Sequence, residues 1–301
     1  MCKKILLLVI IIATFSITIK AEDGSGGQSS AFLRRGINSR ALAMGGAYTG
    51  LSNDISSTYW NPAGLTGLSK TEFMGMISLL NYDRSEIYAA AGHNFSDDIV
   101  IGLGWYKFGV GNIDGRDLNG DATEIFDDSQ NCLMLSVAKR FNAFSFGVTG
   151  KYINHSLYKN SASGLAFDLG IKVALLDNSL NLGFVIQDLG GKIKWDTANK
   201  TEESLPTTLR IGASYNLQFI NAIVSTEFVK VNQEKSLLRA GAEYSIVQFF
   251  GVRAGYDGFN PTFGLFIKLP DNLFPLRLDY AAINDKISNG YVNQISFQIY
   301  L

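Results

Sequence analysis

The C-terminal stretch Gln294-Ile-Ser-Phe-Gln-Ile-Tyr-Leu301 alternates between two kinds of side chain. Its odd-numbered residues are Ile, Phe, Ile and Leu, and its even-numbered residues are Gln, Ser, Gln and Tyr. Because successive side chains of an extended strand point to opposite faces, this stretch has one apolar face and one polar face. It predicts a strand that separates an apolar environment from a polar one.

The same pattern recurs from Thr71 to Leu301, and no helical period interrupts it. An even number of strands, each of about 9–11 residues, is typical of a single-chain bacterial barrel that crosses a membrane. The sequence therefore predicts an all-β, antiparallel transmembrane barrel of about fourteen strands. The expected strands are 71–81, 86–95, 98–109, 130–140, 143–155, 163–175, 179–188, 207–218, 221–230, 236–246, 250–257, 261–269, 275–283 and 291–301.

The connections between these strands alternate in length. Those after even-numbered strands are mostly a few residues long, whereas three of those after odd-numbered strands are long: 110–129, 156–164 and 189–206. Short turns at one end and long loops at the other are a feature of outer-membrane barrels.

The alternation allows two orientations. A water-soluble barrel or sandwich would turn its apolar faces inward, and a membrane barrel would turn them outward. Two observations favour the membrane barrel. Tyr and Phe recur near strand ends, as expected for aromatic girdles at the bilayer edges. The polar faces carry many glycines and charges of both signs, which can pair in a crowded lumen: Arg210, Glu227, Arg239, Glu243, Arg253, Asp257, Arg277 and Asp279.

Composition agrees with this interpretation. Charged residues make up 18% of the chain, below the level of about a quarter in typical soluble proteins. The formal net charge is −1, so nothing indicates a nucleic-acid partner. Residues 1–21 combine Lys3 and Lys4 with an apolar run and end at Ala21, which predicts a signal peptide rather than the alternative of a membrane anchor helix.

A second apolar segment precedes the expected barrel. Residues 22–70 include Leu42, Tyr48 and Trp60, together with turn-forming residues, so we expect this segment to pack inside the lumen as a hatch. Its motif residues are Arg40, Gly45, Gly46, Asn53, Asp54, Asn61 and Pro62.

These residues carry a resemblance to a known family. Arg40-Ala-Leu-Ala-Met-Gly-Gly-Ala-Tyr48, Asn53-Asp54 and Tyr59-Trp-Asn-Pro-Ala-Gly-Leu65 look like the N-terminal signature of the PorV/PorQ outer-membrane proteins. More distantly, they resemble the hatch of the FadL-type long-chain fatty-acid transporters. The resemblance implies a fourteen-stranded barrel with an N-terminal hatch, in the bacterial outer membrane.

The resemblance also leaves two functions open. The FadL side implies passage of hydrophobic, fatty-acid-like compounds, with apolar lumen positions near the hatch. The candidates for these positions are Met74, Met76, Tyr106, Phe108 and Phe266. The PorV side implies a secretion-linked barrel that docks proteins exported by a type IX-like system, through loops 110–129 and 189–206.

An enzyme is not expected. The chain contains no Gly-x-Ser-x-Gly motif, and His93 and His155 are its only histidines, so a catalytic triad or histidine metal site has few options. Cys132 would be the only cysteine left after signal cleavage, so no internal disulfide is expected. We predict no cofactor and no metal. The expected partners are outer-membrane lipid and either a hydrophobic ligand or secreted proteins.

Overall fold

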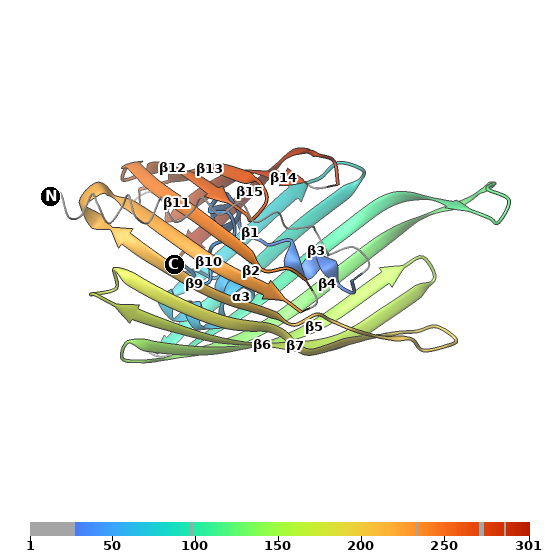
Figure 1. Cartoon of the computed structure of the whole chain (residues 1–301), viewed down its shortest axis with the longest axis horizontal. Helices are drawn as coiled ribbons and strands as arrows, with labels where there is room; N and C mark the ends of the chain where they lie inside the picture. The colour runs from blue at the N-terminus through green and yellow to red at the C-terminus, as the bar shows by residue number, and fades with distance from the viewer. Residues whose placement is uncertain (1–27, 97–98, 233, 271–273, 286) are drawn as a thin grey trace.

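The structure is a computed structural model that describes residues 28–96, 99–232, 234–270, 274–285 and 287–301. The expected signal peptide, residues 1–21, lies outside the described residues. The strands form one antiparallel sheet, tilted around a common axis (Figure 1), and the sheet closes because β1 pairs with β15 and β6 pairs with β7. The strands are β1 Thr71–Leu79, β2 Arg84–Ser96, β3 Ile99–Arg116, β4 Ala122–Phe141, β5 Phe144–Leu157, β6 Asn160–Leu175, β7 Leu180–Trp195, β8 Glu202–Ser204, β9 Thr208–Leu217, β10 Ala222–Val231, β11 Leu237–Val247, β12 Phe250–Tyr256, β13 Pro261–Lys268, β14 Leu276–Asp285 and β15 Gly290–Tyr300.

The predicted fold class is confirmed, with fourteen strands in the barrel wall. The short β8 pairs only with the far end of β7 and was not expected. Within the wall, β7 keeps its pairing with β9 up to Gln187. Beyond that point the β6–β7 register shifts twice, as β-bulges do.

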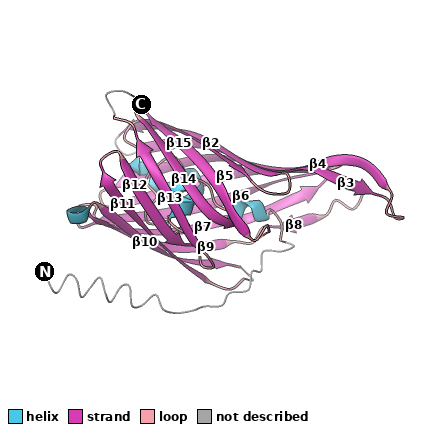
Figure 2. Ribbon diagram, turned by 90° about the horizontal axis from the view of Figure 1, so that it is seen from above, coloured by secondary structure: helices cyan, strands magenta, loops and turns pink. Residues whose placement is uncertain are grey.

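The prediction of three long loops is wrong. Strands β3 and β4 continue well past the barrel rim as a two-stranded ribbon, which extends to one side in Figures 1 and 2, and only 117–121 connect them. Strands β5 and β6 are joined by two residues, and β7 runs on to Trp195. Beyond the rim both faces of a strand meet water, so the alternation disappears although the backbone hydrogen bonds continue.

The apolar faces point outward, as the membrane orientation predicts. In β15, Gln294 is fully buried in the lumen, whereas 54% of Ile295 is exposed on the outer wall. The outer wall is covered by Leu, Ile, Val and Phe, and the lumen holds the Arg, Asp, Glu, Ser and Gln side chains of the strands. None of the helices in the described part of the chain is long and apolar enough to cross a membrane.

The segment before β1 fills the lumen. It contains four short helices: η1 Ala31–Arg34, α2 Ser39–Ala43, α3 Ser57–Trp60 and η2 Pro62–Gly67. Figure 2 shows helical turns enclosed by the strands. From residue 36 to residue 66 every residue except Asn53 is buried. We call residues 28–70 the hatch.

The hatch approaches the wall so closely because many lumen-facing wall residues are glycines. A Cβ atom on Gly147 of β5 would collide with the main chain of Pro62, and one on Gly241 of β11 would collide with the main chain of Met44. Similar collisions with hatch atoms would occur at Gly92, Gly102, Gly170, Gly183, Gly212, Gly255 and Gly264. The glycines of the polar faces therefore form a cradle for the hatch.

This contact predicts different outcomes for two glycines of β5. We expect Gly147→Ala to destabilise the folded barrel by about 1–3 kcal/mol, because the added methyl group overpacks the contact with Pro62. Gly150 faces outward, and the nearest atom to an added Cβ is in the ring of Phe167, 3.9 Å away. Gly150→Ala is therefore the matched control. The measurement is thermal unfolding in detergent, and equal melting temperatures for the two variants would contradict the cradle.

Candidate functional site: the hatch and the vestibule above it

The Glu243 carboxylate in β11 is the centre of the polar contacts between hatch and wall. Arg40 of α2 donates to both of its oxygens, from Nε at 3.0 Å and from Nη2 at 3.2 Å. Arg253 Nε, at 2.6 Å, and Arg277 Nη2, at 3.3 Å, reach the same carboxylate from β12 and β14. Asp279 offsets the excess positive charge, because it lies 2.7 Å from Arg253 and 3.0 Å from Arg277.

Arg40 also holds the hatch together internally. It donates to Asn53 Oδ1 at 3.0 Å and to the Tyr48 hydroxyl at 3.3 Å. Tyr48 in turn donates to Asp54 at 2.5 Å. Burial alone would lower the pKa of Arg40, but the neighbouring Glu243 carboxylate raises the pKa above its ordinary value. Arg40 therefore stays charged in a dry environment.

A second carboxylate, Glu227 of β10, accepts hydrogen bonds from the hatch backbone. The donors are the amide groups of Tyr48, at 3.0 Å, and Thr49, at 2.7 Å. Arg210 of β9 completes the cluster with an ion pair of 2.9 Å, and its guanidinium lies over the ring of Trp60. The wall thus supplies acceptors for main-chain donors that no helix satisfies.

The remaining hatch-motif residues have structural positions of their own. Gly45 and Gly46 have φ values of +68° and +71°, in the region that favours glycine. Asn61 donates to the carbonyl groups of Thr49 and Ile171. Pro62 follows it at the first position of η2.

Two lumen ion clusters were missed by the sequence analysis. Lys151 lies 2.8 Å from both Asp168 and Asp188, and all three are buried. In the other cluster, Asp285 pairs with Arg84 and Arg35, and Arg35 also pairs with Glu86. Lys151, Asp168 and Glu86 occupy the polar parity of their strands, so the alternation could have identified them.

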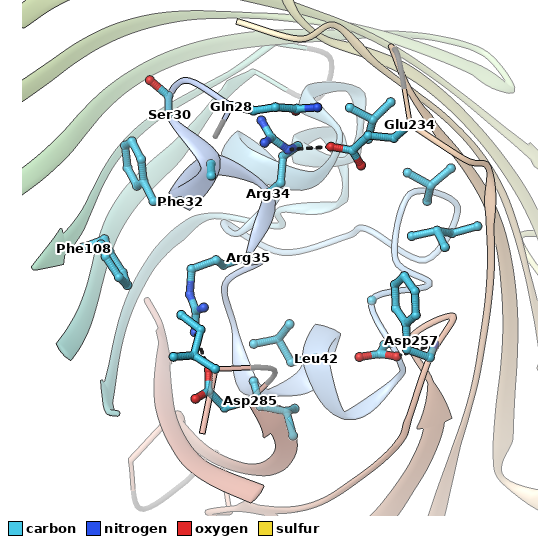
Figure 3. Close-up of a pocket in the computed structure, with 18 of the residues that line it drawn as sticks. Gln28, Ser30, Phe32, Arg34, Arg35, Leu42, Phe108, Glu234, Asp257 and Asp285 are labelled. Carbon is cyan, nitrogen blue, oxygen red and sulfur yellow. Dashed lines mark hydrogen bonds and ion pairs between the residues drawn. The ribbon is translucent and has the colours of Figure 1, made fainter. Parts of the chain in front are cut away.

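An open cavity of about 1010 Å³ lies between the hatch and the end of the barrel from which the β3–β4 ribbon projects. We call it the vestibule; Figure 3 shows it lined by hatch residues and by residues from the wall. It combines apolar and charged walls. Its apolar lining includes Phe32, Leu42, Phe108, Trp195, Val229, Val231, Leu237 and Ile283, and its charged lining includes Arg34, Arg35, Arg210, Arg239, Glu203, Glu234, Asp257 and Asp285.

The five predicted apolar lumen residues are all buried, but only Phe108 lines the vestibule. Tyr106 packs against Phe32 with ring centres 5.4 Å apart. Phe266 lies beneath the guanidinium groups of Arg253 and Arg277. The other two, Met74 and Met76, face the lumen below the vestibule, where the Met76 sulfur accepts a hydrogen bond from the hatch amide of Asn38.

Two guanidinium groups of the vestibule have nitrogens without a hydrogen-bond partner among the described residues. They are Nε and Nη2 of Arg34 and Nε of Arg239. Glu234 is the nearest carboxylate to Arg34, at 4.0 Å, too far for a hydrogen bond (Figure 3). Burial lowers the pKa of Arg34 from its ordinary value. Asp257, by contrast, is used in a turn, where it accepts from the amides of Phe259 and Asn260.

These features define a closed membrane-type barrel with a fixed internal hatch and an amphipathic vestibule. No family model matches the sequence, and no curated protein sequence matches it either. Solved structures do match. They include the P. putida toluene transporter TodX, with 12% identity, a TM-score of 0.60 and coverage of 88% of this chain and 99% of TodX.

Two further matches have the same fold. The CymD monoaromatic hydrocarbon channel has 12% identity and a TM-score of 0.61, over 88% of this chain and 98% of CymD. A Pseudomonas aeruginosa FadL homologue has 11% identity and a TM-score of 0.57, over 84% of this chain and 96% of the homologue. At such low identity the likeness shows the fold alone.

The Glu243 cluster predicts a large effect of a small substitution. We expect Glu243→Gln to destabilise the barrel by about 3–5 kcal/mol, because it leaves buried guanidinium groups without their carboxylate. Glu202→Gln is the control, since the Glu202–Lys192 pair is exposed to solvent and contributes little. Denaturant unfolding measures both variants, and limited proteolysis reports whether the hatch of the Glu243 variant becomes accessible.

Proposed function

We propose that this barrel allows hydrophobic, fatty-acid-like compounds to pass across the bacterial outer membrane, with the vestibule as the binding chamber. The observation that carries the proposal is the vestibule itself. Its volume of about 1010 Å³ is at the upper end of the range of about 300–1,000 Å³ for small-molecule sites. Its apolar wall suits a hydrocarbon chain, and Arg34 and Arg239 have donors for a polar end that bond to none of the described residues.

The comparisons support passage rather than catalysis. TodX is described as a toluene transporter and CymD as a monoaromatic hydrocarbon channel. Because residues 36–66 fill the lumen of this chain, a compound in the vestibule requires a local movement of the hatch before it can proceed. The contacts of Glu227 and Glu243 with the hatch are among those that oppose such a movement.

Blocking the vestibule tests the proposal. Val229 lines the cavity, and its neighbour Phe228 points outward on the same strand. We expect Val229→Trp to lower the uptake of a fluorescent 12-carbon fatty acid into vesicles several-fold, because the indole occupies the chamber. Phe228→Trp should behave as the unsubstituted protein. Equal uptake by both variants would argue against the vestibule as the route.

The free guanidinium donor of Arg239 gives a separate prediction. Hydrogen bonds to charged groups contribute about 1.5–3 kcal/mol, so we expect Arg239→Ala to weaken dodecanoate binding about tenfold or more. Dodecanol binding should change little. Calorimetry with detergent-purified protein measures both ligands, and Arg116→Ala, on the distant ribbon, is the control.

The alternative is a secretion-linked barrel of the PorV/PorQ type that docks exported proteins. The ribbon of β3 and β4 favours it, because it projects past the rim and carries Asp114, Asp117, Asp121, Glu124 and Asp127 but only one basic residue, Arg116. Removing residues 112–126 distinguishes the two functions. Loss of protein export with normal fatty-acid uptake would support docking, and the reverse result would support passage.

A further inference from the structure

The outer wall of the barrel has a groove that the proposed passage function does not use. Its volume is about 840 Å³, and it extends from Phe297 of β15 across strands β1–β6 on the outside of the barrel. Most of its lining belongs to two adjacent rows of registered residues. One row is Ala89, Trp105, Leu133, Tyr152 and Leu165, and the next is Ala91, Leu103, Leu135, Gly150 and Phe167.

The groove exists because small residues interrupt a surface of large ones. Ala89, Ala91 and Gly150 lie between large apolar side chains that are exposed on the outer wall. Above Gly150 an added Cβ would have only the ring of Phe167 nearby. No residue of the two rows is charged. Lys151 also borders the groove, but its side chain points into the lumen and pairs with Asp168.

A polar row lies directly above the groove, one step toward the end of the barrel with the ribbon. It consists of Lys107, Asn131, Asn154 and Ser163, which face each other across strands β3–β6. Trp105, at the upper edge of the groove, donates from its indole nitrogen to Asn131 at 3.2 Å. A tryptophan between apolar and polar rows is typical of the edge of a bilayer.

Lys107 is the charged residue among these four, and the row continues on β7 with Lys194, opposite Ser163. Lys107 is the lysine next to the groove. It lies two residues from Trp105 on the same face of β3, and it forms no ion pair or hydrogen bond with any residue that the structure describes. The groove below it is apolar, and a cationic group is available at its upper end. This combination suits a molecule with an anionic head and hydrocarbon chains.

A second copy of the chain fits this surface less well. Most dimers use a symmetric contact, in which the same surface patch of both copies forms the interface. Such a contact here would bring two Lys107 side chains together without a counter-charge. A lipid brings its own counter-charge and is already present in the surrounding membrane.

We infer that the groove is a binding site for an acyl lipid with a phosphate head, with the chains along the two apolar rows and the phosphate at Lys107. The long extensions of bacterial barrels face the outside of the cell, and the β3–β4 ribbon is such an extension. The lipid therefore belongs to the outer leaflet under the membrane placement proposed above. The site is separate from the vestibule, and therefore its test is independent of fatty-acid uptake.

Native mass spectrometry of the full-length barrel in a neutral detergent tests the site. The probes are phosphatidic acid and diacylglycerol with identical 16-carbon chains, which differ only in the phosphate. We expect Lys107→Ala to weaken phosphatidic acid binding about fivefold, the contribution of one lysine near an anionic surface, and to leave diacylglycerol binding unchanged. Gly150→Leu, which fills the groove, should weaken the binding of both lipids.

Lys230→Ala is the matched control. Lys230 also faces outward near the ribbon end of the barrel, but on the opposite wall, and its ammonium group donates to the carbonyl of Glu234. This variant should bind both lipids as the unsubstituted protein does. The inference is overturned if Lys107→Ala and Lys230→Ala have equal effects on phosphatidic acid, or if Gly150→Leu changes neither lipid. Heat-modifiable gel mobility verifies that each variant is folded.

Discussion

Direct main-chain contact between the hatch and the wall is the constraint on which the rest of the structure depends. Eight strands enclose a space that their own side chains can fill, but fourteen leave a wider lumen. Here the hatch occupies that space, and it can do so only because the facing wall positions, such as Gly147 and Gly241, lack side chains. The glycines of the polar faces are therefore as necessary for the position of the hatch as the charged residues are.

The buried charges follow from the same arrangement. A segment of short helices leaves backbone amides without partners, and Glu227 accepts two of them. Glu243 gathers three arginines, one of them from the hatch. Replacing such clusters by apolar residues is often neutral or stabilising. In this barrel the buried ion clusters are best explained by a positioning role, because they fix where the hatch lies within the lumen.

Much of the wall could be predicted from the sequence, because a strand between lipid and lumen has a different solvent on each face. Where both faces of a strand meet the same solvent, the alternation is lost and the sequence no longer predicts the strand. The ribbon beyond Val110 has water on both sides and shows no alternation, so its sequence does not predict the strands that form there. The partners of the lumen charges could not be predicted either. Arg40 and Glu243 are 203 positions apart, and their contact depends on the register of the whole sheet and the path of the hatch.

The pairing of β1 with β15 sets the order in which the molecule can be assembled. The first and last strands of the wall are neighbours, so the sheet has two unpaired edges until the final residues are in place. The hatch is joined directly to β1, and its α2 helix packs against β13 and β14, so the hatch contacts the wall on both sides of the closing pair. Closing the β1–β15 pair therefore also encloses the hatch. The hatch in turn sets the width of the lumen around which the wall closes.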